Sequence, residues 1–130
     1  MPMKQLYIGL IALMLAACDT LPTKQRGPIN HVVLVWFKDS VNAGEIAEVR
    51  AGTLELQTIP GIRSIQVGTA VPSRRTIVDD SFDLGIVMTF DSAADMRAYL
   101  EHPQHQAFVQ RFIKGRVNKL LVYDIDAESH

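Results

Sequence analysis

The chain has 130 residues, of which 48% are hydrophobic, and a formal net charge of −1. This length fits one domain, and the nearly balanced charge argues against the basic surface that a nucleic-acid partner requires. The single cysteine, Cys18, excludes an intrachain disulfide and any zinc site built from several cysteines. We expect no cofactor, because no glycine-rich phosphate loop follows a strand and no haem-attachment motif is present.

The first segment of the chain predicts a lipoprotein signal peptide over residues 1–17. Lys4 precedes the uncharged apolar stretch from Leu6 to Ala17, which is shorter than the ~20 residues of a membrane-spanning helix. Leu15-Ala16-Ala17-Cys18 then resembles a bacterial lipobox. The resemblance implies cleavage before Cys18 and lipidation of its sulfur. The alternative is a plain secretory signal with a cysteine nearby by chance.

Residues 18–28 are expected to form a lipidated tether between this signal and the folded domain. The segment DTLPTKQRGP is polar and contains proline and glycine. We therefore expect a protein of the cell envelope, lipid-anchored to a bacterial membrane on the periplasmic side. Asp19 resembles the inner-membrane retention signal of enterobacterial lipoproteins and favours the inner membrane over the outer one.

Residues 29–38 predict a strand that is covered on both of its faces, because the sequence INHVVLVWFK is apolar at nearly every position. Alternation places His31, Val33, Val35 and Phe37 on one face, and Val32, Leu34 and Trp36 on the other. The helices of so small a domain cover one face only. A second subunit is expected to cover the other.

Residues 42–58 predict a helix. Asn42 and Glu45 have the spacing of a capping box, and Pro60-Gly61 breaks the helical pattern.

Two strands follow this helix. Residues 62–71 alternate, with Gly68 as a candidate bulge, and residues 72–81 form a polar loop. Residues 82–90 alternate clearly, which places Phe82 on the same apolar face as the strand's other large side chains.

A second helical region begins at Ser92. Pro103 fits the first residue of a new helical turn, and Gly115 fits the end of that helix. Residues 117–125 predict the last strand.

The predicted order is β-α-β-β-α-β, which is the ferredoxin-like α+β arrangement with a four-stranded antiparallel sheet and helices on one face. The other face carries large apolar residues and must be buried. A homodimer with the two sheets face to face, forming an α/β barrel, buries it most simply.

Three segments carry a family resemblance: NHVVLVWFKD, IPGIRSIQVG, and the region from FDLGIVMTF to YLEHPQHQAF. In this order they resemble the stress-responsive A/B barrel family, also called Dabb, over roughly residues 29–126. The domain is therefore assigned to residues 29–128. The resemblance implies a dimeric α+β barrel. It does not imply one function, since similar barrels include monooxygenases, cyclases and proteins without known chemistry.

Plant polyketide cyclases of this family close a linear polyketide by an intramolecular aldol condensation. They use a histidine of the H-P-x-H turn as the base, a tyrosine just before that turn and a histidine on the first strand. The resemblance carries these roles to His105, Tyr99 and His31. A second tyrosine of the cyclase pocket falls near Gly52, and this departure argues against the same substrate.

The histidines allow three interpretations. His102 and His105 could bind a metal together with His31 or Asp83, but their spacing is not that of known zinc or iron motifs, so we expect no metal. His102 is expected to cap the turn before Pro103. His105 and His31 either hydrogen-bond within the core or act as acid and base. For His31 the answer depends on whether its face of the strand meets the helices.

Two functions remain open at this point, and whether the chain is an enzyme is left undecided. One is a module that binds a small apolar molecule, or acts in stress response, without chemistry. The other is a cofactor-free enzyme of the polyketide-cyclase or monooxygenase type, acting on an apolar carbonyl compound, with His105 as general base helped by Tyr99 and His31. A cavity lined by these three side chains favours the enzyme, and a filled interior argues against it.

Overall fold

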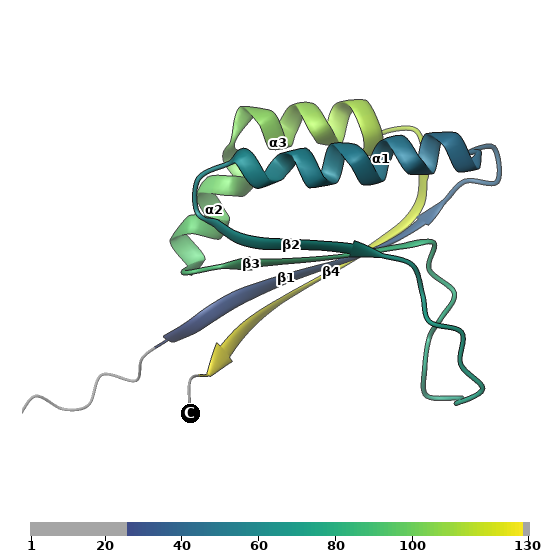
Figure 1. Cartoon of the computed structure of the whole chain (residues 1–130), viewed down its shortest axis with the longest axis horizontal. Helices are drawn as coiled ribbons and strands as arrows, with labels where there is room; N and C mark the ends of the chain where they lie inside the picture. The colour runs from purple at the N-terminus through teal and green to yellow at the C-terminus, as the bar shows by residue number, and fades with distance from the viewer. Residues whose placement is uncertain (1–25, 129–130) are drawn as a thin grey trace, which may run out of the picture.

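The computed structural model describes residues 26–128 and shows one layer of helices on one face of an antiparallel sheet (Figure 1). The predicted signal peptide, Cys18 and most of the tether lie outside these residues. The elements are β1 (Arg26–Phe37), α1 (Ala43–Glu55) with a 3₁₀ turn (Leu56–Thr58), β2 (Ile62–Gly68), β3 (Leu84–Phe90), α2 (Ala93–Glu101), α3 (Pro103–Phe108) with a π-helical continuation (Val109–Ile113), and β4 (Val117–Glu128). Within the described part of the chain, no helix has the length and apolarity needed to cross a membrane.

The strand order is β2-β3-β1-β4, and all neighbouring strands are antiparallel. This order confirms the predicted ferredoxin-like arrangement. β1 lies inside the sheet between β3 and β4, and the helices cover only one of its two apolar faces.

Local signals in the sequence set the helix starts. The side chain of Asn42 accepts a hydrogen bond from the backbone N–H of Glu45, and the Glu45 carboxylate accepts one from the N–H of Asn42, both at 3.0 Å. The predicted capping box is therefore confirmed. At α2 the hydroxyl of Ser92 accepts from the N–H of Asp95 at 3.1 Å.

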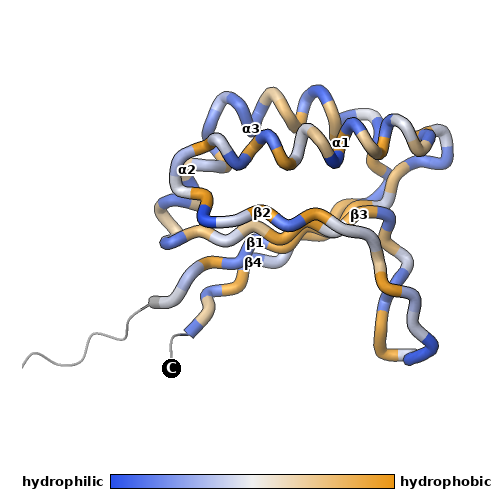
Figure 2. Tube along the Cα trace, viewed as in Figure 1, coloured by the Kyte–Doolittle hydropathy of each residue, from blue (hydrophilic) through white to orange (hydrophobic). Residues whose placement is uncertain are grey.

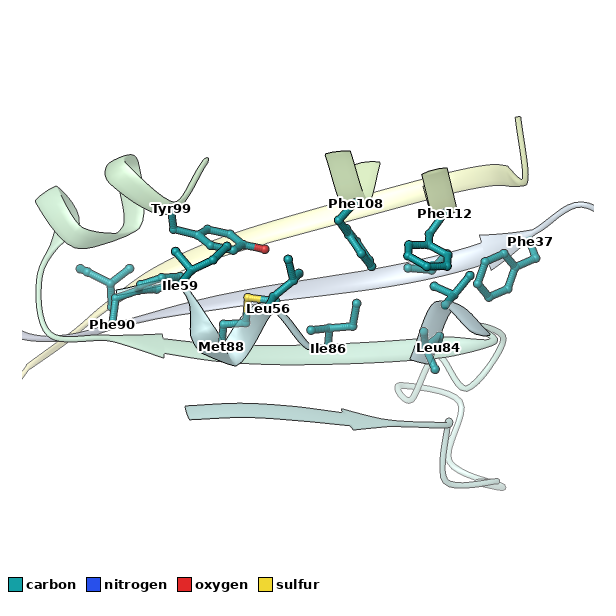
Figure 3. Packing of buried hydrophobic residues seen from close by; sticks show 13 residues of the cluster. Phe37, Leu56, Ile59, Leu84, Ile86, Met88, Phe90, Tyr99, Phe108 and Phe112 are labelled. Atoms are coloured by element: carbon teal, nitrogen blue, oxygen red, sulfur yellow. The ribbon is translucent and has the colours of Figure 1, made fainter. Parts of the chain in front are cut away.

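The core lies between the sheet and the helices. Val35, Leu84 and Phe90 are fully buried on the sheet side. Burial of each such side chain stabilises the folded state by about 1.5–3 kcal/mol relative to leaving it exposed. Figure 3 shows Tyr99 close to Phe90 at one end of this cluster. In Figure 2, hydrophobic residues lie along the strands, and in β2 they alternate with hydrophilic ones.

Three local predictions need correction. β1 begins at Arg26 rather than Ile29, because β4 extends to Glu128 and pairs with it. Gly68 pairs regularly with a residue of β3, and the irregularity of β2 lies instead between Ile62 and Ser64. Phe82 precedes β3 and does not share the buried face of that strand, since its ring packs edge-on against Trp36 at a centroid distance of 6.3 Å.

Candidate functional site

His31 lies on β1 with its side chain towards the helices. Its ring is 6.1 Å from that of Tyr99 on α2 and 6.4 Å from that of Phe90 on β3, measured between centroids. The residue is only 5% exposed. The helices therefore meet the face of β1 that carries His31, and the choice that the sequence left open is resolved in favour of one shared site.

Asp124 on β4 belongs to the site and was missed at the sequence level. It sits directly opposite His31 in the β1–β4 register, and its Oδ1 is 2.6 Å from Nδ1 of the imidazole. The His31 side chain is 7% exposed and that of Asp124 is 43% exposed. The carboxylate accepts the Nδ1–H proton, so the ring is held in one tautomer with its Nε2 free to act on a ligand.

A break between α2 and α3 brings Tyr99 and His105 together. His102 has the extended backbone that a residue before proline prefers (φ −65°, ψ 134°), and Pro103 then begins α3. Nδ1 of His102 accepts a hydrogen bond from the N–H of Gln104 at 3.1 Å, which confirms its predicted role as a cap. The new direction of α3 places the His105 ring 4.4 Å from the ring of Tyr99.

His105 is held as a neutral imidazole. Its Nδ1 donates to the backbone carbonyl of Leu100 at 3.1 Å, which is the only hydrogen bond that this ring makes within residues 26–128. Burial lowers the pKa of His105, and the nearby His31 lowers it further, while the Leu100 carbonyl acts in the opposite direction. An unprotonated Nε2 is the form that can accept a proton near neutral pH.

Tyr99 supplies a hydroxyl without a partner in the described part of the chain. The residue is 2% exposed, and burial raises the pKa of its phenol, so the group stays protonated. Figure 3 shows the hydroxyl pointing away from α2 towards the middle of the core cluster. A buried phenol of this kind can donate a hydrogen bond to a ligand oxygen.

These three side chains line one cavity of about 200 Å³ between the sheet and α2–α3. The rest of its wall is apolar: Val33, Val35, Ile86, Met88, Leu100, Phe108, Val109, Ile113, Leu120 and Val122. On β4, the edge strand, Leu120 and Val122 are 43% and 44% exposed, so solvent reaches the cavity from this side. The π-helical continuation of α3 contributes Val109 and Ile113, and such segments are frequent at functional sites.

The side chains that were weighed as a metal site do not converge. His102 caps α3, and the Asp83 carboxylate accepts the backbone N–H of Phe37 at 2.8 Å, beyond the far end of the cavity. Within residues 26–128, no group of three or more His, Cys, Asp or Glu side chains is arranged to hold a metal ion.

Gly52 on α1 lies near the position to which the family resemblance assigns a second tyrosine of the plant cyclases. Here the Phe112 ring occupies the space beside Gly52. A Cβ at position 52 would lie only 2.5 Å from that ring. A tyrosine at position 52 is incompatible with this packing. Among the described residues that line the cavity, Tyr99 supplies the only phenol.

Fold and site together define a ferredoxin-like α+β domain with a mostly apolar cavity under its helices, in which two imidazoles and one phenol meet. The chain belongs to the stress-responsive A/B barrel domain (Dabb) family, whose model matches residues 29–127. The stress-response A/B barrel domain-containing protein HS1 of Arabidopsis thaliana is 30% identical over 100 residues, which cover 76% of this chain and 89% of that protein.

Two solved structures show the same fold. The hydroxynitrile lyase of Passiflora edulis matches with a TM-score of 0.71 at 22% identity, over 80% of this chain and 96% of that one. A dimeric ferredoxin-like protein of Thermobifida fusca, of unknown function, matches with a TM-score of 0.66 at 20% identity, over 82% and 97%. At such identities the likeness shows the fold alone.

Proposed function

We propose that the domain binds a small, largely apolar molecule that carries one carbonyl oxygen. The observation that carries the proposal is the cavity itself, in which an apolar wall surrounds the Tyr99 hydroxyl and the His31 and His105 rings. Small-molecule sites typically combine an apolar lining with a few convergent polar groups. A stress-response role, suggested by the name of the Arabidopsis relative, is compatible with this activity.

The cavity volume indicates the size of the ligand. An apolar protein cavity of ~150 Å³ holds benzene, so about 200 Å³ suits a monocyclic or short-chain compound. The Tyr99 hydroxyl donates and therefore suits a carbonyl oxygen. His105, as a neutral imidazole, does not supply the positive charge that a carboxylate or phosphate prefers.

Acetophenone tests the binding proposal, with cumene as a control of similar size that has a methyl group in place of the oxygen. Isothermal titration should give tighter binding of acetophenone than of cumene to the full chain. Tyr99→Phe, which removes the donor to the carbonyl oxygen, should weaken acetophenone binding and leave cumene binding unchanged. Equal affinity for both compounds contradicts the assignment of a carbonyl ligand.

A second candidate is proton abstraction next to the carbonyl of the bound molecule. It is favoured by one observation, the neutral His105 whose Nδ1 is fixed by Leu100 and whose Nε2 remains available. In this reaction His105 removes a proton from the α-carbon and Tyr99 donates a hydrogen bond to the developing enolate oxygen. Its signature is exchange of the acetophenone methyl protons in D₂O, followed by NMR. A pure binding module gives no exchange above the buffer rate.

The chain is also proposed to form a homodimer through the sheet face that the helices leave uncovered. Val32 and Leu34 of β1 lie on this face, and Val32 pairs with Tyr123 of β4, which is 53% exposed. The Thermobifida protein of the same fold is described as dimeric. Sedimentation of the full chain at micromolar concentration should give twice the monomer mass, and a monomer mass contradicts the proposal.

The lipid anchor predicted from Cys18 stays a proposal, because that residue lies outside the described part of the chain. It rests on the apolar segment and the lipobox-like sequence alone. Cys18→Ala should move the protein from the membrane fraction to the soluble fraction of an expressing bacterium. Retention of the variant in the membrane argues against the anchor.

A further inference from the structure

The segment between β2 and β3, residues 69–83, forms an arm that leaves the sheet on the side away from the helices (Figure 1). It carries Val71 and Ile77, which are 81% and 82% exposed and are the most exposed large apolar side chains within residues 26–128. Isolated exposed apolar residues are common on protein surfaces, so exposure alone does not indicate an interface. The shape and position of the arm add two further arguments.

The first argument is that the arm is held in a defined shape without a core of its own. The Asp80 carboxylate accepts the N–H of Ser73 at 2.7 Å, and the carbonyl of Arg75 accepts the N–H of Val78 at 3.0 Å. These bonds close the arm across its width. A preorganised arm loses little conformational entropy when it docks.

The second argument is that the base of the arm is continuous with the uncovered sheet face. The indole N–H of Trp36 donates to the Ser81 hydroxyl at 2.9 Å, and the Trp36 ring contacts Phe82 edge-on. Trp36 alternates with the buried Val35 and Phe37, so it lies on the face opposite the helices. A second protein subunit that covers this sheet face therefore comes within reach of the arm.

We infer that the arm of each copy clasps the second copy of the chain, with Ile77 buried against it. The inference rests on the proposed homodimer and adds to it a specific contact outside the sheet. In a two-fold symmetric pair both arms make the same contact, so a change in one residue acts twice.

Charge favours a protein partner over a membrane surface. Arg74 and Arg75 are matched within the arm by Asp79 and Asp80, and hydrogen bonds from Ser81 lower the pKa of Asp79, which keeps it ionised. Binding to anionic lipid needs an excess of cations, which the arm lacks. Figure 2 shows hydrophilic segments at the end of the arm and hydrophobic ones along its sides.

The position of the arm in the sheet also favours a protein partner over a membrane surface. β3 begins at Leu84, which pairs with Val35, whereas the chain enters the sheet at Arg26. Nine residues of strand, about 30 Å, separate these two ends. A membrane tether attached before Arg26 therefore holds the opposite end of the sheet.

The test is Ile77→Asp in the full chain, with the dimer dissociation constant measured by sedimentation equilibrium. The matched control is Leu54→Asp, which places the same charge on an exposed leucine of α1, on the other side of the domain. Burial of an isoleucine predicts about tenfold weaker association per arm, or about 100-fold for both. Leu54→Asp should change the constant less than threefold. Ile77→Ser should fall between wild type and Ile77→Asp.

The outcomes separate the two proposals. A wild-type dimer with an equally tight Ile77→Asp dimer overturns the clasp and leaves the homodimer standing. A monomeric wild type overturns both. Flotation with vesicles of phosphatidylcholine and phosphatidylglycerol is run in parallel, and loss of vesicle binding with an unchanged dimer constant overturns the clasp in favour of a membrane contact. Because Ile77 is exposed, circular dichroism should show the same fold in every variant.

Discussion

Tyr99→Phe separates a binding role of the phenol from a structural one, because it removes a single oxygen atom. The ring of Tyr99 packs against Phe90 at 5.2 Å and His105 at 4.4 Å between centroids, and phenylalanine retains both contacts. The hydroxyl makes no hydrogen bond to any residue of the described range 26–128. The substitution therefore leaves no buried donor or acceptor of the protein without its partner.

The expected change in stability is small or favourable. Removal of a buried hydroxyl that lacks a protein partner relieves a desolvation cost, so the free energy of unfolding should stay within about 1 kcal/mol of the wild type or increase. The ligand, in contrast, loses one hydrogen bond, worth about 0.5–1.5 kcal/mol. This corresponds to roughly a twofold to tenfold weaker affinity for acetophenone at 25 °C.

Urea unfolding followed by circular dichroism measures the first quantity, and isothermal titration with acetophenone measures the second. Cumene has no oxygen for the phenol to contact, so its affinity should be the same for both proteins. A loss of more than 2 kcal/mol in stability would refute the reasoning, since it would mean that the hydroxyl holds the fold together. Unchanged acetophenone affinity would refute the binding role.

Three other changes probe the surroundings of the cavity. Asp124→Asn should cost at most about 1 kcal/mol of unfolding free energy, because solvent screens the half-exposed carboxylate, while Asp126→Asn on the same strand should cost nothing measurable. His105→Gln should flatten the pH dependence of stability. In the folded wild type the pKa of His105 is lowered from 6.5, so below about pH 6.5 the unfolded state binds a proton that the folded state does not. Wild-type stability therefore falls as the pH drops through this range, and the variant lacks this loss. Gly52→Ala should cost about 1–2 kcal/mol, since the clash with Phe112 exceeds the gain in helix propensity, and Phe112→Leu should relieve part of that cost in the double variant. Urea unfolding measures all three.

The fold was predictable because its signals are local. Alternating strands, the Asn42 capping box and the break at Pro103 are each read within one turn or strand, and together they define the order of elements. The approach of Tyr99 to His105 was also predictable, since both lie on consecutive helical segments. The arm was not, because a polar loop gives no indication of the side of the sheet on which it leaves.

The role of Asp124 could not be obtained from local patterns. It lies 93 positions from His31, and their contact depends on the register between β1 and β4. A shift of one residue would turn the carboxylate to the other face. The sequence does contain a weak signal, which is an acid inside an otherwise apolar last strand. Such a carboxylate has to be either solvated at an edge of the sheet or paired with another side chain. Asp124 is both, since it lies on the edge strand β4 and is hydrogen-bonded to His31.

The two imidazoles of the cavity differ in what holds them, and this difference suits carbonyl chemistry. Nδ1 of His31 lies 2.6 Å from the carboxylate of Asp124, whereas Nδ1 of His105 meets the backbone carbonyl of Leu100, in a partly buried setting. Burial, and to a smaller extent the nearby His31, lower the pKa of His105, so this imidazole stays neutral near neutral pH. In the proposed reaction His105 is therefore the base, while Tyr99 is the hydrogen-bond donor to the oxygen and Asp124 fixes the orientation of the His31 ring in the cavity wall. One cavity can in this way offer a hydrogen-bond donor and a base at the same pH, the donor from a phenol and the base from an imidazole.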